Sequence, residues 1–560
     1  MVFACTLAAL TIACGSRTTT PAQSREATAG GELTVSIRTE PRNFGRFGPR
    51  ESTTDLVNSL LHASLVRINR QSDDVEPWLA EGWSKSADGL TYTITLREGV
   101  TFSDGHPLTT DDVVFSFQAV YAAGVPEAIE VDGKRLTVTA VDPRTVTITF
   151  PSPFAPGLRI LDNVVILPKH KLQPLLAAGK LTTAWLASTP PSEMAGLGPF
   201  VVSSFEAGQR LVLAKNPNYW RKSGSASLPY IDRVVFDIIP DEQTQLLRLE
   251  AGQIDMTSSQ LPAEDYAPLK KDADAGRVKL YDLGPALYPD FFWINLKPGA
   301  FAGDPRAAWI QRDELRAAIS LAVDRQLFAD TVFLGAGVPV FGPVSPAIKK
   351  WYWEGTPKIP HDPERAKKLL ASIGLVDRNG DGILRDAGGR PAKFTVVTQK
   401  GRPPFERGVA VIRDELKKIG LTVDAVPLDG NAVVDQFVSG KYEAIYMNAY
   451  QSTEDPALTS DVWLSSGSSH FWNPEQKTPA TAWEKAIDAQ MHIVAVSSDA
   501  AERKSAFDEV QKIFVEHQPA IYFVAQRQFV ASSTRVGNVV PVPTRPQLLW
   551  EPDTITVTGR

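Results

Sequence analysis

The chain has 560 residues, of which 43% are hydrophobic and 22% are charged, and its formal net charge is −6. These proportions are typical of a folded globular protein that is long enough for two or three hydrophobic cores. Acidic and basic residues are intermixed, without the basic stripe that binds a run of phosphates, so nucleic acid is not an expected partner. No apolar run reaches the roughly 18 residues of a membrane-spanning helix.

Both cysteines lie near the start of the chain, Cys5 and Cys14, so no disulfide framework is expected. The apolar segment 1–13 ends in small residues before Cys14 and resembles the signal region and lipobox of a bacterial lipoprotein. This resemblance implies a lipid on Cys14, followed by a flexible tether over 15–30. The alternative is a frayed apolar terminus of a cytoplasmic protein.

The first half of the chain predicts many strands. Residues 33–37 alternate as a strand, and the leucines of 52–68 have helical spacing. In TYTITL, Tyr92, Ile94 and Leu96 alternate with threonines, which indicates a half-buried strand. A second alternating pair, within 136–149, turns at Asp142-Pro143. We therefore expect a β-rich subdomain over 67–190.

A cluster of chemically active residues lies in the same region, with Asp104, His106, Asp111 and Asp112 close in sequence. Thr109 and Asp112 have the spacing of a capping box, which places both neighbouring aspartates in the first turn of a helix. His106 has no second histidine within helical reach. The cluster is therefore predicted to be structural, and no metal site is expected.

The second half of the chain predicts an α/β domain. Strands are expected within 198–220 and 233–240, and from residue 312 onward longer helices alternate with short apolar runs. The segment DRNGDGILRD places Asp377, Asn379 and Asp381 at calcium-loop spacing, but Gly388 occupies the position of the final bidentate glutamate. A plain turn is favoured over bound calcium.

Catalytic motifs are absent from the sequence: it contains no G-x-S-x-G, H-E-x-x-H, P-loop or G-x-G-x-x-G. The seven histidines are scattered along the chain. We therefore expect a protein that is not an enzyme and that uses no cofactor.

Three segments carry a family resemblance: WSKSADGLTYTITLREGVTFSDGHPLTTDDVVFSF, GLGPFVVSSFEAGQRLVLAKNPNYW and DELRAAISLAVDR. They resemble the extracytoplasmic solute-binding proteins of peptide and nickel ABC transporters, the oligopeptide/dipeptide-binding family, and the similarity extends over about 31–530. The resemblance implies an α/β, two-lobed periplasmic-binding-protein fold with a hinge and an extra β-rich subdomain in the first lobe. The expected division is lobe I over 31–66, 191–284 and 525–560, the subdomain over 67–190, and lobe II over 285–524.

The resemblance also directs attention to the segment AYQSTEDP. Peptide-binding relatives have an aspartate four residues before this proline, which pairs with the α-ammonium group of the ligand; here the position is Ser452. A hydroxyl group cannot neutralise an enclosed ammonium group. Glu454 or Asp455 is expected to take over this role if the ligand is a peptide, although Asp455 also suits a turn before Pro456.

The expected ligand is a peptide, with an oligosaccharide or another organic solute as the alternative. The expected partners are the permease subunits of an ABC importer and, through Cys14, a bacterial membrane; the protein is expected to be a periplasmic, extracytoplasmic monomer. A sensory or interaction protein with the same fold is the second class considered. The residues expected to contact the ligand are Phe44, Trp293, Asn448, Tyr450, Gln451, Ser452, Asp455, Trp472 and Tyr522.

Overall fold

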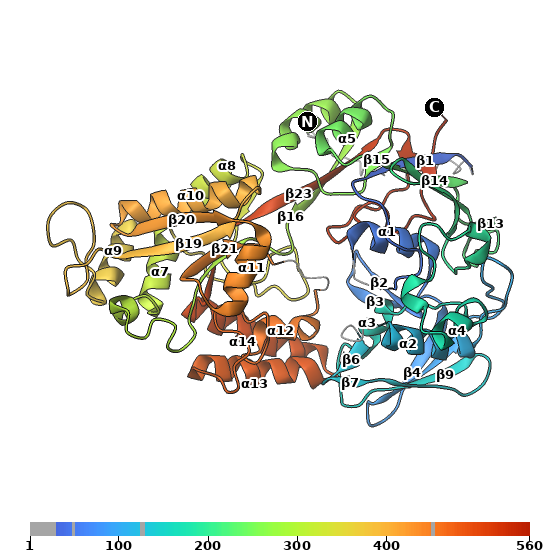
Figure 1. Ribbon diagram of the computed structural model, residues 1–560, viewed down its shortest axis with the longest axis horizontal. Coiled ribbons are helices and arrows are strands. Elements are labelled where there is room, and N and C mark those ends of the chain that lie inside the picture. Colours follow the sequence, from blue (N-terminus) through green and yellow to red (C-terminus); the bar gives the residue numbers. More distant parts are fainter. Residues whose placement is uncertain (1–29, 48–50, 124–128, 450–453, 560) are drawn as a thin grey trace, which may run out of the picture.

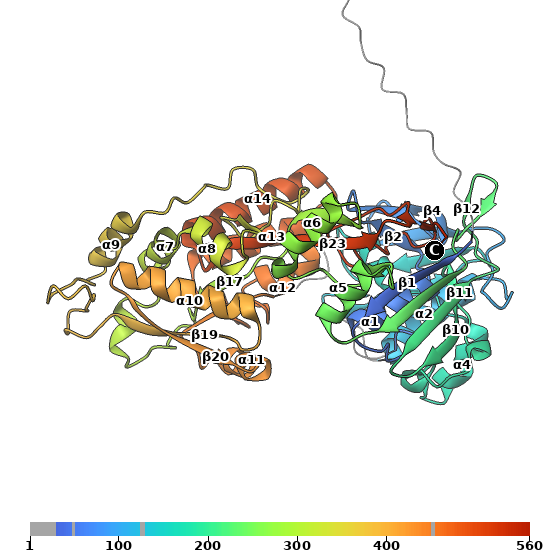
Figure 2. The ribbon, with the colours of Figure 1, turned by 90° about the horizontal axis from the view of Figure 1, so that it is seen from above.

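The computed structural model describes residues 30–47, 51–123, 129–449 and 454–559. They form two lobes that lie side by side, and two long strands connect them (Figures 1 and 2). The connecting strands are β16 (Val278–Pro285) and β23 (Val524–Ser533), which pair antiparallel along most of their length. The predicted two-lobed α/β fold is confirmed.

Lobe I is built on a mixed sheet in the order β10-β11-β14-β1-β15-β23-β16, with β18 (Gly337–Pro339) paired to β23. The first strand, β1, pairs parallel with both β14 and β15. Its apolar residues Leu33, Val35 and Ile37 are fully buried, as the alternation predicts. Apart from β16, β18 and β23, the strands of this sheet are β1 (Glu32–Ile37), β10 (Phe200–Glu206), β11 (Arg210–Lys215), β14 (Arg233–Ile238) and β15 (Met256–Thr257).

A separate sheet, which is antiparallel and has the order β4-β5-β9-β8, packs beneath lobe I around its own hydrophobic core (Figure 1). In β5, Tyr92, Ile94 and Leu96 are buried and the threonines are half-buried, so the predicted half-buried strand is confirmed. The elements of this unit are β2 (Val66–Asn69), β3 (Asp74–Pro77), β4 (Ala80–Lys85), β5 (Thr91–Leu96), β8 (Thr137–Ala140), β9 (Thr145–Thr149), α2 (Thr110–Ala122) and α4 (Lys169–Ala177).

In the acidic cluster predicted to be structural, Asp111 and Asp112 lie in the first turn of helix α2. The Asp112 carboxylate accepts a hydrogen bond from the backbone N–H of Thr109 at 3.0 Å, and Asp111 pairs with Lys169. The ring of His106 stacks on His170, with 3.9 Å between the ring centroids, a long-range contact that local spacing did not indicate. Among the described residues, no group of three or more His, Cys, Asp or Glu side chains is arranged to hold a metal ion.

Lobe II has a five-stranded sheet in the order β20-β19-β21-β17-β22, covered by helices on both faces (Figures 1 and 2). Strand β17 shows why the sheet needs two covering layers: Phe292 and Ile294 enter one hydrophobic core, whereas Phe291 and Trp293 enter the other. The elements are β17 (Phe291–Ile294), β19 (Lys393–Gln399), β20 (Thr422–Leu428), β21 (Ala444–Met447), β22 (Ala520–Tyr522), α7 (Asp313–Ala322), α8 (Arg325–Val332), α9 (Pro363–Ser372), α10 (Pro403–Lys418), α11 (Gly430–Ser439), α13 (Ala482–Val496) and α14 (Ala500–His517).

The loop with calcium-like spacing folds on its own hydrogen bonds. The Asp377 carboxylate accepts the backbone N–H groups of Asn379, Gly380 and Gly382, and Asp381 pairs with Arg385. These carboxylates therefore stabilise a turn through donors of the loop itself.

The lobes also touch on the side away from the connecting strands. The backbone N–H of Ala155 donates to the carbonyl oxygen of Ala495 at 2.7 Å, and Lys350 Nζ lies 3.2 Å from Asp74 Oδ1. The two lobes thus enclose the space between them from both ends. No helix in the described part of the chain is long and apolar enough to cross a bilayer.

Candidate functional site

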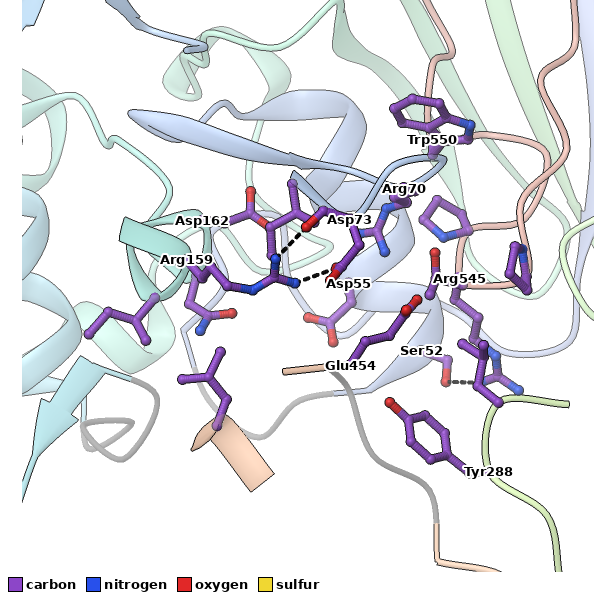
Figure 3. A pocket seen from close by; sticks show the side chains of 18 of the residues that line it. Ser52, Asp55, Arg70, Asp73, Arg159, Asp162, Tyr288, Glu454, Arg545 and Trp550 are labelled. Atoms are coloured by element: carbon purple, nitrogen blue, oxygen red, sulfur yellow. Dashed lines mark hydrogen bonds and ion pairs between the residues drawn. The ribbon is translucent and has the colours of Figure 1, made fainter. Parts of the chain in front are cut away.

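A cavity of about 2000 Å³ lies between the two lobes. Lobe I and its β-rich unit supply one wall, and lobe II supplies the other (Figure 3). The cavity is much larger than a pocket for a single drug-sized ligand, which typically measures about 300–1,000 Å³. Arginine and acidic side chains line it together with the aromatic residues Trp78, Phe154, Tyr288, Phe405 and Trp550.

The lobe I wall carries a nearly buried pair, Arg159 and Asp73 (Figure 3). Arg159 Nη1 also donates to the backbone carbonyl oxygen of Asp73 at 2.6 Å, which fixes the loop between β2 and β3. The pair is incompletely satisfied, because Arg159 Nε and Asp73 Oδ2 are buried without a hydrogen-bond partner. Burial raises the pKa of Asp73, and Arg159 opposes the rise. Such atoms call for a further polar partner in the cavity.

A second arginine on this wall, Arg67, is held by carboxylates and rings together. It pairs with Glu76 and, at 2.6 Å, with Glu551. Its guanidinium lies 3.9 Å from the ring centre of Trp78 and 5.1 Å from that of Trp550. Stacking on aromatic rings together with ion pairs to two carboxylates fixes an arginine in place.

The lobe II wall presents Glu454, which faces Asp55, Asp73 and Asp162 of the opposite wall (Figure 3). No hydrogen bond or ion pair joins its carboxylate to another described residue. Burial raises the pKa of Glu454 to about 7, and the Asp73 carboxylate adds to the rise. The arginines and Lys350 nearby only partly offset this effect. Glu454 is therefore an acid whose negative charge is poorly compensated by the protein itself.

The neighbouring Asp455 has a different environment, although it lies one residue further along. It is 2% exposed and accepts hydrogen bonds from Arg503 Nη2 at 2.7 Å and from the backbone N–H of Ala457 at 3.0 Å. It caps the short helix Pro456–Thr459 in this way. Asp455 is thus engaged by the protein, and it does not line the cavity.

Asp290 is a second poorly compensated acid on lobe II. It follows the connecting strand β16, lines the cavity and accepts a hydrogen bond from the Tyr446 hydroxyl at 3.3 Å. Burial raises the pKa of Asp290 to about 7, although Tyr446 and Asn448 lower it. No ion pair joins it to a described lysine or arginine.

Comparison with known proteins identifies the family. Residues 74–471, more than half of the chain, match the model for bacterial extracellular solute-binding proteins, family 5 Middle. The chain belongs to this family. The family consists of binding proteins, in agreement with the absence of catalytic motifs from the sequence.

Individual relatives agree with this assignment. The chain is 27% identical to a probable ABC transporter-binding protein of Deinococcus radiodurans, over 84% of this chain and 83% of the relative. It is also 27% identical to the oligopeptide-binding protein AppA of Bacillus subtilis, over 88% and 85%. Among solved structures, the ABC transporter substrate-binding protein CtaP of Listeria monocytogenes superposes with a TM-score of 0.76 at 22% identity, covering 95% of this chain and all of that one. This last likeness supports the fold.

In the solute-binding protein, the residues expected to contact ligand are not all brought together. Asn448 lines the cleft and donates to the carbonyl oxygen of Tyr288 at 2.6 Å, and Tyr522 lines a small cavity beside the cleft. Phe44, Trp293 and Trp472 lie in hydrophobic cores, and none of them lines the cleft. Tyr450, Gln451 and Ser452 lie outside the described residues, as does Cys14.

Several cleft residues were not anticipated from the sequence. Asp73 comes from a loop of the β-rich unit, Arg159 and Asp162 come from its short helices Gly157–Ile160 and Leu161–Asn163, and Trp550 comes from the C-terminal segment. None belongs to a recognisable motif. The sequence does indicate an acid in the segment that contains Glu454 and Asp455. Only the tertiary contacts of the two residues show which one faces the cleft.

Proposed function

We propose that this solute-binding protein is the extracytoplasmic component of an ABC importer, and that it captures a peptide between its lobes for delivery to a membrane permease. The observation that carries the proposal is Glu454, a poorly compensated carboxylate facing the cleft from lobe II. The ammonium group of a peptide supplies the positive charge that this carboxylate lacks.

The choice of Glu454 follows from the contacts of its neighbour. Asp455 already binds Arg503, so recruiting it for a ligand would leave that arginine without its partner. Glu454 needs no such exchange. Asp73 on the opposite wall adds negative charge near Glu454, which the nearby arginines and Lys350 only partly offset, and this favours a cation further.

The rest of the cleft suits a peptide as well. A chain of several residues needs a long cavity, and about 2000 Å³ is available. Aromatic side chains offer apolar surface for varied ligand side chains. A ligand carboxylate would be attracted by the arginines that line the cavity, which are Arg38, Arg46, Arg67, Arg70, Arg159, Arg402 and Arg545. The similarity to an oligopeptide-binding protein supports the same ligand class.

Calorimetry with free-amine tripeptides and with their N-acetylated counterparts tests the proposal. Glu454→Gln should weaken binding of the free-amine peptides by about 2–5 kcal/mol, the range for a broken buried charge pair. Asp132→Asn is the matched control, because this acid lines the same cavity but is exposed. Binding that is indifferent to N-acetylation, or tight binding of a neutral oligosaccharide in place of peptides, would refute the proposal.

The proposal includes a monomeric protein held at the membrane by a lipid on Cys14, which is supported by the apolar segment before that cysteine. Fractionation of cells that express the Cys14→Ala protein checks this part. Retention of that protein in the membrane fraction would argue against the anchor.

A further inference from the structure

A second, smaller cavity of about 40 Å³ adjoins the cleft on the lobe II side. The two cavities share three lining residues, which are Tyr288, Pro289 and Glu454. The small cavity therefore begins at the carboxylate to which we assign the ligand's ammonium group. Any atom bonded to the carbon that carries this group lies within a few ångströms of its entrance.

The walls of the small cavity are formed mainly by closely packed aromatic and aliphatic side chains, and the hydroxyl-bearing Tyr288, Thr459 and Tyr522 lie among them. Phe291, Trp351, Trp463 and Phe507 are each at most 6% exposed and belong to one hydrophobic core. Their rings brace one another, for example Trp463 against Phe507 with 5.1 Å between centroids. Phe291 likewise contacts Phe471 and Tyr522, at 5.1 Å and 5.3 Å. The shape of the cavity is thus set by packed aromatic rings.

The charge and size of the cavity restrict its occupant. Glu454, at the entrance, is the sole charged side chain among its described lining residues, so a buried carboxylate would be repelled and a buried cation beyond the entrance would lack a partner. A volume of about 40 Å³ has room for roughly three water molecules. That corresponds to a branched aliphatic group of about three or four carbon atoms.

We propose that this cavity receives the side chain of the first residue of the bound peptide and selects aliphatic residues the size of valine or leucine. The inference rests on the proposed function, since it uses the ammonium group at Glu454 to bring the first side chain to the entrance. Glycine leaves the cavity empty, tryptophan exceeds it, and aspartate adds an unpaired charge.

Calorimetry of the full-length protein with the tripeptides X-Gly-Gly tests the selection, with X as Gly, Val, Leu, Trp or Asp. Leucine or valine should bind at least about tenfold tighter than glycine, because an apolar side chain leaves water. Tryptophan and aspartate should bind more weakly than leucine. The series Gly-Gly-X, which varies the last residue, serves as the ligand control and should show a smaller spread.

Two variants change the cavity in opposite directions. Val462→Phe adds a ring at a half-buried lining position and should abolish the preference for leucine over glycine. Ile348→Ala enlarges the cavity and should shift the preference toward larger side chains. Val434→Phe, at a position of lobe II that is 51% exposed, is the control and should leave the preference unchanged. Circular dichroism confirms that each variant is folded.

The outcomes separate this inference from the function on which it rests. Peptides that bind through their ammonium group with equal affinity for every X would overturn the cavity assignment and leave the proposed function intact. Equal loss of affinity for glycine and leucine peptides in Val462→Phe would overturn it too. Failure of all free-amine peptides to bind would overturn both.

Discussion

Lobe I and lobe II present charge to the cleft in different ways. On lobe I, Arg159 is paired with Asp73, and Arg67 is paired with two glutamates and stacked against tryptophans. On lobe II, Glu454 and Asp290 face the cleft without an ion pair to a described residue, and the pKa of each is raised to about 7 by burial. These arginines of lobe I thus have partners within the protein, whereas the two acids of lobe II are left for the charge of the ligand to compensate.

The largest effect should come from breaking a pair on lobe I. Arg159→Leu leaves Asp73 in a nearly buried site without its cation, so the free energy of unfolding should fall by about 3–5 kcal/mol. Urea denaturation without ligand measures this loss. The double variant Arg159→Leu/Asp73→Asn removes both charges and should recover part of the stability. A single variant as stable as the wild type would mean that the pair does not fix this wall.

On lobe II, removing a charge should have the opposite effect and raise the free energy of unfolding. The pKa of Glu454 is about 7 in the folded protein against an ordinary value of 4.5, so ionisation of this group costs stability. The cost is absent below about pH 4.5, grows as the pH rises, and is complete above pH 7. Glu454→Gln should therefore raise the free energy of unfolding by about 1–3 kcal/mol at pH 8, and by little at pH 4.5.

Urea denaturation of the ligand-free protein at several pH values checks this sign. Asp132→Asn provides the comparison, because its carboxylate is exposed and already accepts a hydrogen bond from Ser152. A loss of stability in Glu454→Gln at pH 8 would indicate that the carboxylate is already compensated. The contrast between the two walls would then disappear.

The limits of sequence reasoning follow from the range of the contacts involved. The strand Thr91–Leu96 and the cap of helix α2 depend on neighbours within a few residues, and both are predicted from local pattern. Glu454 and Asp455 are adjacent, and their different roles depend on Arg503, which lies 48 residues away. No local pattern encodes that partner.

Aromatic residues illustrate the same limit. The sequence makes Trp293 and Trp472 candidates for the cleft, because large rings often line ligand sites. Both side chains are buried within a hydrophobic core of lobe II. Trp78 and Trp550, which do line the cleft, come from sequence regions on opposite sides of that lobe and meet around Arg67. Alternation within a strand predicts only on which face of its own sheet a side chain lies. Whether an aromatic ring reaches the cavity depends on how the lobes pack.

The smallest effect is expected where the walls meet. Lys350 Nζ lies 3.2 Å from Asp74 Oδ1 and 3.5 Å from the carbonyl oxygen of Asp73, so it links lobe II to the β-rich unit across the cleft. Both partners are well exposed, at 44% and 68%, and an exposed ion pair contributes about 0.2–1 kcal/mol. Lys350→Ala should therefore ease separation of the lobes slightly and speed ligand release by at most about fivefold. Stopped-flow measurement of release checks this, and the difference from wild type should shrink at 0.5 M salt as the pair is screened.

Lys349→Ala removes the same charge from an exposed neighbour that forms no ion pair with a described residue, and it should release ligand at the wild-type rate. Equal acceleration in both variants would assign the effect to net charge and would remove Lys350 from the contact between the walls.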